Sequence, residues 1–134
     1  MKELLAESDF IILTVPLTKE TYKMIGENEI NLMKRTAYLI NISRGAVIDH
    51  IALVKALKEG RIAGVALDVF HEEPLPTDDP ILKLDNVILT PHIAAFTKEA
   101  REKLSITAAE EVIRVLKGEK PRYPINNPQK RDNK

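Results

Sequence analysis

The chain has 134 residues, of which 44% are hydrophobic and 30% charged, a composition typical of one globular domain with its own core and not of a disordered chain. Twenty lysines and arginines balance 20 aspartates and glutamates, so charge gives no reason to expect nucleic acid or a membrane surface as a partner, and no apolar run reaches the roughly 20 residues of a membrane helix. The absence of cysteine excludes disulfides and thiolate metal sites, and we expect a cytoplasmic protein.

Four short apolar runs predict strands, at residues 10–15, 37–42, 64–67 and 87–90. The first and third lack polar alternation, which is typical of strands buried on both faces of a parallel sheet. Pro16 and Pro91 end the first and last runs, since proline cannot donate to a strand ladder.

Helical segments alternate with these strands. Apolar spacing predicts helices over 2–7 and 27–33, a further helix between Asp49 and Gly60, one helical turn over 80–84, and a long helix from Thr97 to about Lys117. Asp49 and Thr97 are expected N-caps, and Gly60 suits the left-handed position after a helix. Strands alternating with helices on short connections indicate an α/β fold with a parallel sheet.

A candidate site residue follows each predicted strand, and those after the second, third and fourth strands are ionisable. In chain order they are Pro16, then Arg44, then Asp68 with Glu73, and finally His92. Because right-handed crossovers place the carboxyl ends of parallel strands along one edge, and ligands bind beyond that edge, we expect these residues to share a cleft.

These residue types suit hydride transfer to or from a small acid. Arg44 offers a planar fork for a carboxylate, His92 exchanges protons near neutral pH, a carboxylate beside it would raise its pKa, and Asp68 is placed to hold the amide of a nicotinamide ring. Taken singly, each has an ordinary reading: a turn arginine, a helix cap, a solvated glutamate and a packed histidine. Their common edge favours the functional reading.

Metal binding is not predicted. The three histidines, His50, His71 and His92, are widely spaced and form no recognised ligand pattern.

Four stretches closely resemble the D-isomer-specific 2-hydroxyacid dehydrogenases, a group that includes phosphoglycerate, glyoxylate/hydroxypyruvate and D-lactate dehydrogenases. They are S-D-F-I-I-L-T-V-P-L-T, M-K-R-T-A-Y-L-I-N-I-S-R-G-A-V-I-D, G-R-I-A-G-V-A-L-D-V-F-H-E-E-P-L-P and N-V-I-L-T-P-H-I-A. The resemblance runs from about Glu3 to Gly118. It implies an NAD-dependent oxidoreductase acting on a 2-hydroxy or 2-oxo acid, and leaves NADP open.

The resemblance also implies roles for individual residues. Arg44 would bind the substrate carboxylate, His92 would be the acid/base, and Glu73, rather than Glu72, would be the histidine's partner. The residues implied to contact the cofactor are Pro16, Thr21, Ile42, Asp68 and Ala94.

One feature of the family is missing. Members run to more than twice this length and place a G-x-G-x-x-G turn before the region seen here, whereas no three of the five glycines have that spacing. We therefore expect residues 1–118 to be the second half of a Rossmann-like doubly wound parallel sheet of about four strands, and 119–134 to be a tail that is mobile from Tyr123 onward.

Two classes of function remain open. The first is a dehydrogenase, here in a truncated form that has little or no turnover by itself. The second is a catalytically silent module that binds nucleotide or associates with another chain. The strand over 10–15 would present an open apolar edge, so we expect a homodimer or larger assembly.

Overall fold

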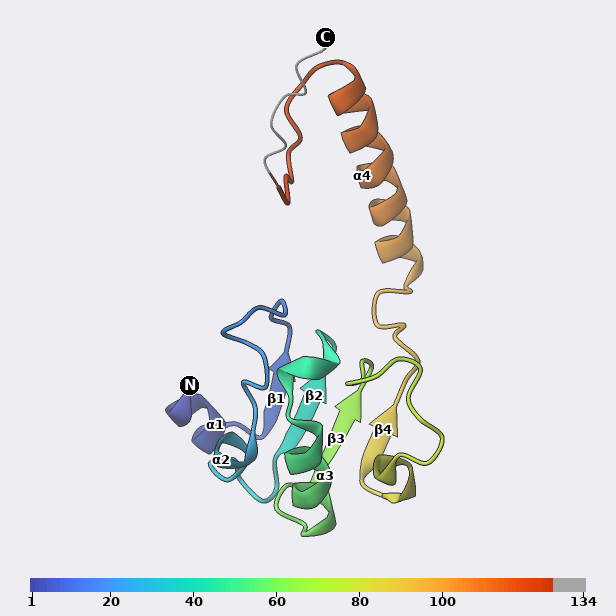
Figure 1. Cartoon of the computed structure of the whole chain (residues 1–134). Coiled ribbons are helices and arrows are strands. Elements are labelled where there is room, and N and C mark those ends of the chain that lie inside the picture. The colour runs from blue at the N-terminus through green and yellow to red at the C-terminus, as the bar shows by residue number, and fades with distance from the viewer. Residues whose placement is uncertain (127–134) are drawn as a thin grey trace. The chain divides into compact units, whose positions relative to one another are not determined.

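The computed structural model describes residues 1–126 (Figure 1), so part of the predicted tail lies outside the described residues. The chain divides into two compact units, Met1–Ala94 and Ala95–Lys134.

The first unit is built on a four-stranded parallel sheet. Its strands are β1 (Phe10–Leu13), β2 (Tyr38–Asn41), β3 (Gly64–Leu67) and β4 (Val87–Leu89), paired in the order β1-β2-β3-β4. All four predicted strands are confirmed, each at the predicted place or a few residues shorter. The architecture is the predicted Rossmann-like α/β fold.

Helical segments precede the first strand and connect the others. They are α1 (Lys2–Glu7), α2 (Glu27–Ile30), α3 (His50–Lys58) and the short 3-10 segments η1 (Gly45–Val47) and η2 (Pro80–Lys83). The Asp49 carboxylate caps α3 by accepting from the N–H groups of Ile51 and Ala52 at 3.1 and 3.3 Å, and Gly60 follows the helix with φ +60°. These local signals were therefore interpreted correctly.

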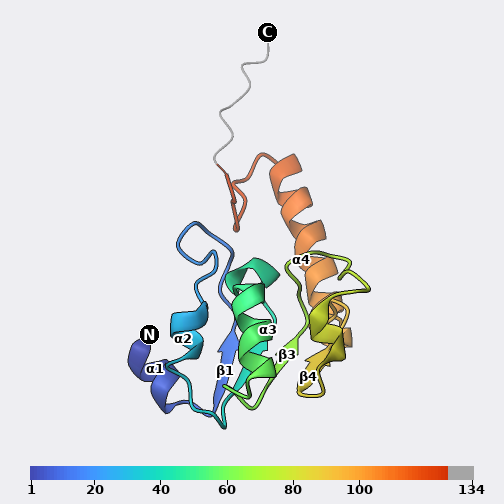
Figure 2. The ribbon, with the colours of Figure 1, turned by 60° about the horizontal axis from the view of Figure 1, so that its bottom comes forward.

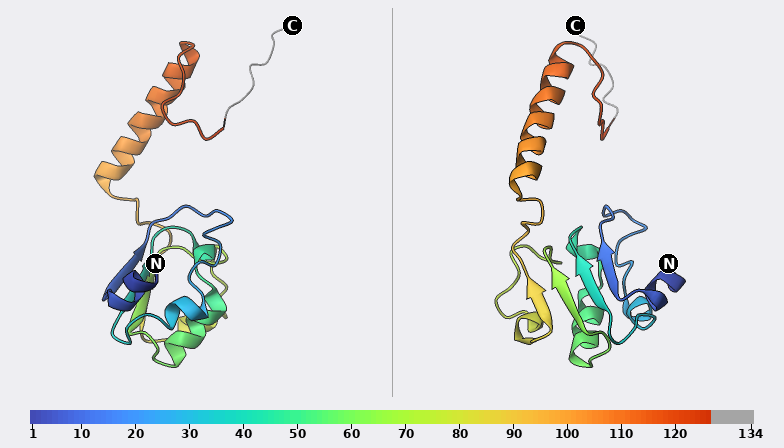
Figure 3. Two further views of the ribbon diagram at one scale, coloured as in Figure 1. Left: turned by 90° about the vertical axis from the view of Figure 1, so that its left-hand side faces the viewer. Right: turned by 180° about the vertical axis from the view of Figure 1, so that it is seen from behind.

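The core lies between the sheet and the helices on one of its faces. Figures 2 and 3 show α2 and α3 on the same side of the sheet. On that side Ile11, Leu39 and Leu67 from the strands and Leu53 and Leu57 from α3 are all buried.

Burial on both faces, predicted for the first strand, is wrong. Residues of β1 alternate: Ile11 is buried, whereas Phe10 and Ile12 are 65% and 56% exposed. The exposed Phe10 ring stacks on that of Tyr38 at 5.6 Å. The reason is that α2 and α3 cover only one face of the sheet (Figure 3). As predicted, β1 lies at an edge of the sheet, and within residues 1–126 it pairs only with β2.

The second unit contains the predicted long helix, α4 (Lys98–Leu116). The Thr97 hydroxyl caps it by accepting from the N–H of Ala100 at 3.1 Å, and Gly118 ends it with φ +80°. The Arg122 N–H donates to Glu111 at 2.7 Å and ties the following segment to the helix. No residue of α4 is buried. Within residues 1–126, no helix is long and apolar enough to cross a membrane.

Candidate active site

The carboxyl ends of all four strands meet at one edge of the sheet, because every strand pair is parallel. Each of the segments that leave this edge carries at least one of the predicted site residues. Figure 3 shows this edge from two sides.

Arg44 stands on a turn that is held by a buried asparagine. The Asn41 side-chain oxygen accepts from the Ser43 N–H at 3.0 Å and from its hydroxyl at 2.8 Å, and the Asn41 amide donates to the Arg44 carbonyl at 3.0 Å. Arg44 itself is exposed, and its Nη1 donates to the Ser43 carbonyl at 2.7 Å. Because a guanidinium has five N–H donors, most of the fork remains free for an acid.

A hollow of about 480 Å³ lies beside this turn. It brings together three predicted residues, Pro16, Ile42 and Arg44, with Thr14, Val15, Leu17 and Ser43. Thr21 lies behind this lining, where its hydroxyl donates to the Pro16 carbonyl at 2.7 Å. Thr21 therefore shapes the loop that carries Pro16.

His92 and Glu73 are in direct contact. His92 Nδ1 lies 2.9 Å from Glu73 Oε2, and Glu73 Oε1 accepts from the Phe70 N–H at 3.0 Å. The pKa of the Glu73 carboxyl lies below its usual value chiefly because His92 donates to it and next because the Phe70 N–H does. Burial opposes this shift, and the charges of His92 and Arg44 add to it. Since the ionised carboxylate accepts a hydrogen bond from Nδ1–H, Nε2 is the ring atom left to exchange a proton with a ligand.

Asp68 holds the segment that carries His92. Its Oδ1 accepts from the Thr90 hydroxyl at 2.6 Å and the Ile93 N–H at 2.8 Å, and its Oδ2 accepts from the Ala94 N–H at 2.8 Å. Burial raises the pKa of this carboxyl, but the three hydrogen bonds and the charge of His92 outweigh burial and leave the pKa below its usual value. The buried carboxylate is therefore ionised at neutral pH.

The backbone at His92 is unusual. His92 has φ +54°, in the left-handed region that side chains other than glycine seldom adopt. Such conformations persist where the surroundings impose them, and they gather at functional sites. Here the N–H groups of the next two residues are bound to Asp68.

A second hollow, of about 410 Å³, adjoins His92 and is mainly apolar. Glu73 and His92 line it with Phe70, Pro74, Leu75, Leu82, Leu89, Thr90 and Pro91. Arg44 and His92 thus line different hollows of the same edge, and the charge of Arg44 still acts on Glu73.

Asn41, Ser43 and Thr90 were missed from the sequence. Asn41 is a polar residue inside the apolar run 37–42, and this exception was the available signal. Thr90 gave no comparable signal, because threonine is common in strands.

The chain is similar to proteins of one family. The family described as "D-isomer specific 2-hydroxyacid dehydrogenase, NAD binding domain" matches residues 1–94. Glyoxylate reductases of Korarchaeum cryptofilum and Thermofilum pendens are 55% and 58% identical over 126 and 123 residues, 94% and 92% of this chain. These stretches are only 38% and 36% of the two relatives, so the chain spans little more than a third of their length.

Solved structures show the same likeness. D-lactate dehydrogenase from Aquifex aeolicus, complexed with NAD and lactic acid, has a TM-score of 0.78 and 44% identity over 87% of this chain and 40% of that one. A glyoxylate reductase from Paecilomyes thermophila has a TM-score of 0.81 and 37% identity over 88% of this chain and 36% of that one. The chain thus belongs to the D-isomer-specific 2-hydroxyacid dehydrogenase family, and its residues 1–94 correspond to that family's NAD-binding domain.

Proposed function

We propose that Arg44, Glu73 and His92 serve the interconversion of a 2-oxo acid and a D-2-hydroxy acid, with glyoxylate as the first substrate to test. The observation that supports this most is the contact between His92 Nδ1 and Glu73 Oε2 at 2.9 Å, at the strand edge that also carries Arg44. The high identity to glyoxylate reductases supports the choice of substrate.

Each residue has a defined task in this proposal. Arg44 binds the substrate carboxylate through its free N–H donors. His92 Nε2 donates a proton to the substrate oxygen as the carbonyl carbon is reduced, and takes it back in the opposite direction. Glu73 keeps the imidazole in the required orientation and fixes which ring nitrogen faces the substrate.

A bound nicotinamide cofactor supplies or accepts the hydride. Pro16, Thr21, Ile42 and Ala94 would surround its nicotinamide end. Asp68 uses three of the roughly four acceptor positions of a carboxylate, which leaves one for an amide donor such as the ring carboxamide. The residues present therefore fit this end of NAD, and NADP fits it equally.

The phosphate end has no counterpart in the printed sequence, which contains no G-x-G-x-x-G. We therefore expect the 134-residue chain alone to show little or no turnover. Steady oxidation of NADH by the purified chain with glyoxylate or hydroxypyruvate would contradict that expectation.

A chimera tests the catalytic roles directly. Residues 3–118 replace the matching segment of the Thermofilum pendens glyoxylate reductase, to which this chain is 58% identical. We expect NADH oxidation with glyoxylate, and a fall in kcat of about 10²- to 10⁴-fold in His92→Asn. Arg44→Lys should chiefly raise KM, because lysine lacks the bidentate fork.

The neighbouring glutamate is the matched control. Glu73→Gln should lower kcat and alter its pH profile, whereas Glu72→Gln should leave both unchanged. Equal effects of the two glutamine variants, or full activity of His92→Asn in an active chimera, would show that the assigned roles are wrong.

A second candidate is a catalytically silent module that associates with another chain. The exposed apolar residues at the β1 edge, Phe10 and Ile12, favour it. Sedimentation should then show a homodimer or larger assembly. A single species at 15.1 kDa over a wide range of concentrations would count against association.

A further inference from the structure

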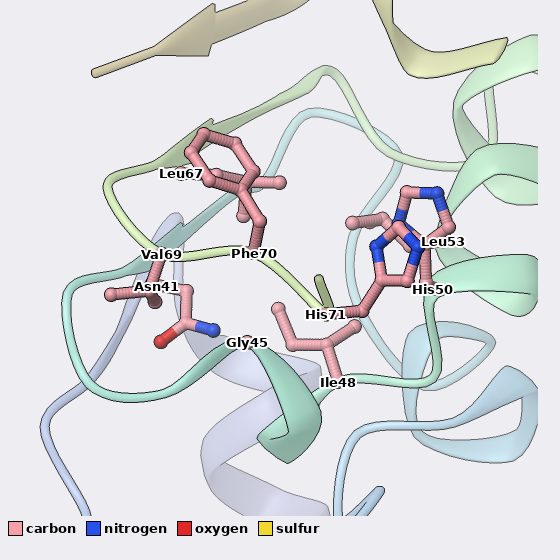
Figure 4. Close-up of a pocket in the computed structure, with 9 residues that line it drawn as sticks. All are labelled: Asn41, Gly45, Ile48, His50, Leu53, Leu67, Val69, Phe70 and His71. Atoms are coloured by element: carbon pink, nitrogen blue, oxygen red, sulfur yellow. The ribbon is translucent and has the colours of Figure 1, made fainter. Parts of the chain in front are cut away.

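A second cluster of histidines and a carboxylate lies outside the candidate active site. It consists of His50 at the start of α3, His71 in the segment after β3, and Asp79, the N-cap of η2. The sequence suggests that the histidines stand apart, but the rings of His50 and His71 stack at 3.9 Å (Figure 4).

The cluster contains more than a hydrogen bond requires. Asp79 Oδ2 lies 2.9 Å from His50 Nε2 and 3.8 Å from His71 Nε2. The first distance is a hydrogen bond and the second is too long for one. A simple histidine–aspartate pair therefore accounts for the position of His50. It does not explain why His71 faces the same oxygen at a distance too long for a hydrogen bond.

Asp79 is oriented for a ligand at Oδ2. Its Oδ1 accepts from the Ile81 N–H at 2.9 Å and also lies 3.1 Å from His50 Nε2, and its side chain is only 4% exposed. In metal sites a ligating carboxylate is commonly fixed in this way by a hydrogen bond from a neighbouring group. Oδ1 is therefore shared between a backbone donor and His50, and Oδ2 is the oxygen that faces both imidazoles.

The spacing of the three groups suits a small cation. One ligand atom of each residue lies within 4.8 Å of the other two. An ion bound tetrahedrally at roughly 2.0–2.1 Å needs ligand atoms about 3.3 Å apart, and the distances of 2.9 and 3.8 Å fall on either side of that value. Because the two rings are stacked at only 22° from parallel, their in-plane Nε2 lone pairs do not converge on one point, and binding requires one ring to rotate out of the stack. His71, whose side chain is 33% exposed, is the ring with room to do so.

The space beside the rings excludes an organic ligand. The cavity that His50 and His71 line, mostly with apolar side chains and without Asp79, has a volume of about 10 Å³ (Figure 4), the room for one water molecule. Two imidazoles and one carboxylate are ligands that Zn²⁺, Co²⁺ and Ni²⁺ accept.

We propose that His50 Nε2, His71 Nε2 and Asp79 Oδ2 bind a divalent first-row transition-metal ion, with Zn²⁺ as the probe. The ion joins three segments that are distant in sequence, namely the start of α3, the residues after β3 and η2. It also restrains the chain close to Glu73, which follows His71 by two positions. This proposal does not depend on dehydrogenase activity.

Titration calorimetry of the full 134-residue chain tests the proposal. The protein carries no histidine tag and is stripped with EDTA. We expect one equivalent of Zn²⁺ to bind, with a rise in the thermal unfolding midpoint. His71→Asn and Asp79→Asn should each weaken binding at least about tenfold, since even changes next to a ligand cost that much. Bound Co²⁺ should give the visible absorption of a four-coordinate, tetrahedral site.

The third histidine provides the matched control. His92 also contacts a carboxylate, and His92→Asn should bind Zn²⁺ as tightly as the unchanged chain. His71 is partly exposed and outside the core, so His71→Asn keeps the test valid if Asp79→Asn fails to fold. No binding to the unchanged chain, undiminished binding by His71→Asn, or loss of binding in His92→Asn would overturn the proposal.

Discussion

Two histidine–carboxylate pairs have the same nitrogen–oxygen distance but differ in solvent exposure. His92 Nδ1 and Glu73 Oε2 are 2.9 Å apart, and so are His50 Nε2 and Asp79 Oδ2. The side chains of the first pair are 50% and 40% exposed, and those of the second 18% and 4%. Distance alone therefore does not distinguish the pair proposed to meet substrate from the pair between distant segments.

Exposure affects the two pairs differently. Burial lowers the pKa of His50, the charge of His71 lowers it further, and the hydrogen bond and charge of Asp79 oppose both effects. At the exposed pair, the hydrogen bond from His92 lowers the pKa of Glu73. The exposed pair has the ionised carboxylate and accessible imidazole that proton exchange needs, whereas the buried pair favours a neutral imidazole.

The segment from Phe70 to Glu73 contributes a residue to the histidine cluster and another to the exposed pair. His71 belongs to one cluster and Glu73 to the other, and the Phe70–His71 backbone passes directly over Gly45. A Cβ atom at Gly45 would overlap the backbone of Phe70. Gly45 is thus the position at which one methyl group should disturb both pairs.

Gly45→Ala should have the largest effect on stability. The new methyl group meets backbone and cannot be accommodated by a side-chain rotation, so we expect a loss of about 3 kcal/mol in the free energy of unfolding. Urea denaturation followed by circular dichroism measures this change.

Gly26→Ala is the control for that substitution. Its Cβ would lie 3.4 Å from the nearest atom, the flexible Glu29 carboxylate. We expect a loss of about 1 kcal/mol or less, since Gly26 is an N-cap, where alanine is disfavoured. Equal losses at the two glycines would rule out the close approach at Gly45.

Removing each carboxylate compares the pairs directly. In EDTA, Asp79→Ala should cost about 2 kcal/mol, because it leaves His50 and the buried Ile81 N–H without an acceptor. Glu73→Ala should cost less than about 1 kcal/mol, as is usual for an exposed pair. The two variants are compared by the midpoints and slopes of urea denaturation. A larger loss of stability in Glu73→Ala than in Asp79→Ala would show that the exposed pair, and not the buried one, contributes more to the stability of the fold.

Local signals explain what the sequence predicted well. Apolar runs located all four strands, and Asp49 and Gly60 marked the ends of α3, because caps and strand propensity act over a few residues. The parallel connections also predicted which strand ends share an edge. The prediction for β1 was wrong because all four of its residues are apolar, so the sequence does not show which of them are exposed. That depends on which face of the sheet is covered by elements distant in the sequence.

The histidine cluster was beyond the reach of the sequence for a different reason. Metal-ligand patterns are recognised when ligands share one helix or loop. His50, His71 and Asp79 come from three separate elements, so their spacing along the chain carries no information about their proximity. Likewise, the shared edge predicted that Glu73 and His92 lie near each other, but not which atoms touch.

Asp68 holds the backbone on either side of His92. Its ionisation should affect how the stability of the fold depends on pH in acid. Because the pKa of Asp68 is lower in the folded chain than its ordinary value of 3.8, ionised Asp68 stabilises the fold above that ordinary value, and this contribution is lost as the pH falls through the lowered pKa. Asp68→Asn should remove this part of the pH dependence and cost about 1–2 kcal/mol at neutral pH, since one amide oxygen cannot replace both carboxylate oxygens.

Thermal unfolding from pH 7 down to the acid transition tests this statement. Asp78→Asn, at an exposed aspartate, controls for the loss of one negative charge. If Asp68→Asn and Asp78→Asn give the same dependence on pH, Asp68 does not contribute through its lowered pKa.

The smallest predicted effect separates the two histidines by their backbones. His92 has φ +54°, so His92→Gly should be more stable than His92→Ala by about 1 kcal/mol. His50 begins α3, where the order should reverse and glycine should be worse than alanine by about 0.5–1 kcal/mol. Each comparison removes the imidazole from both variants, so only the backbone preference remains. Urea midpoints measured in EDTA give the four values. A His92→Ala variant as stable as His92→Gly would show that the left-handed backbone at His92 costs nothing, and that the exposed pair is held without strain.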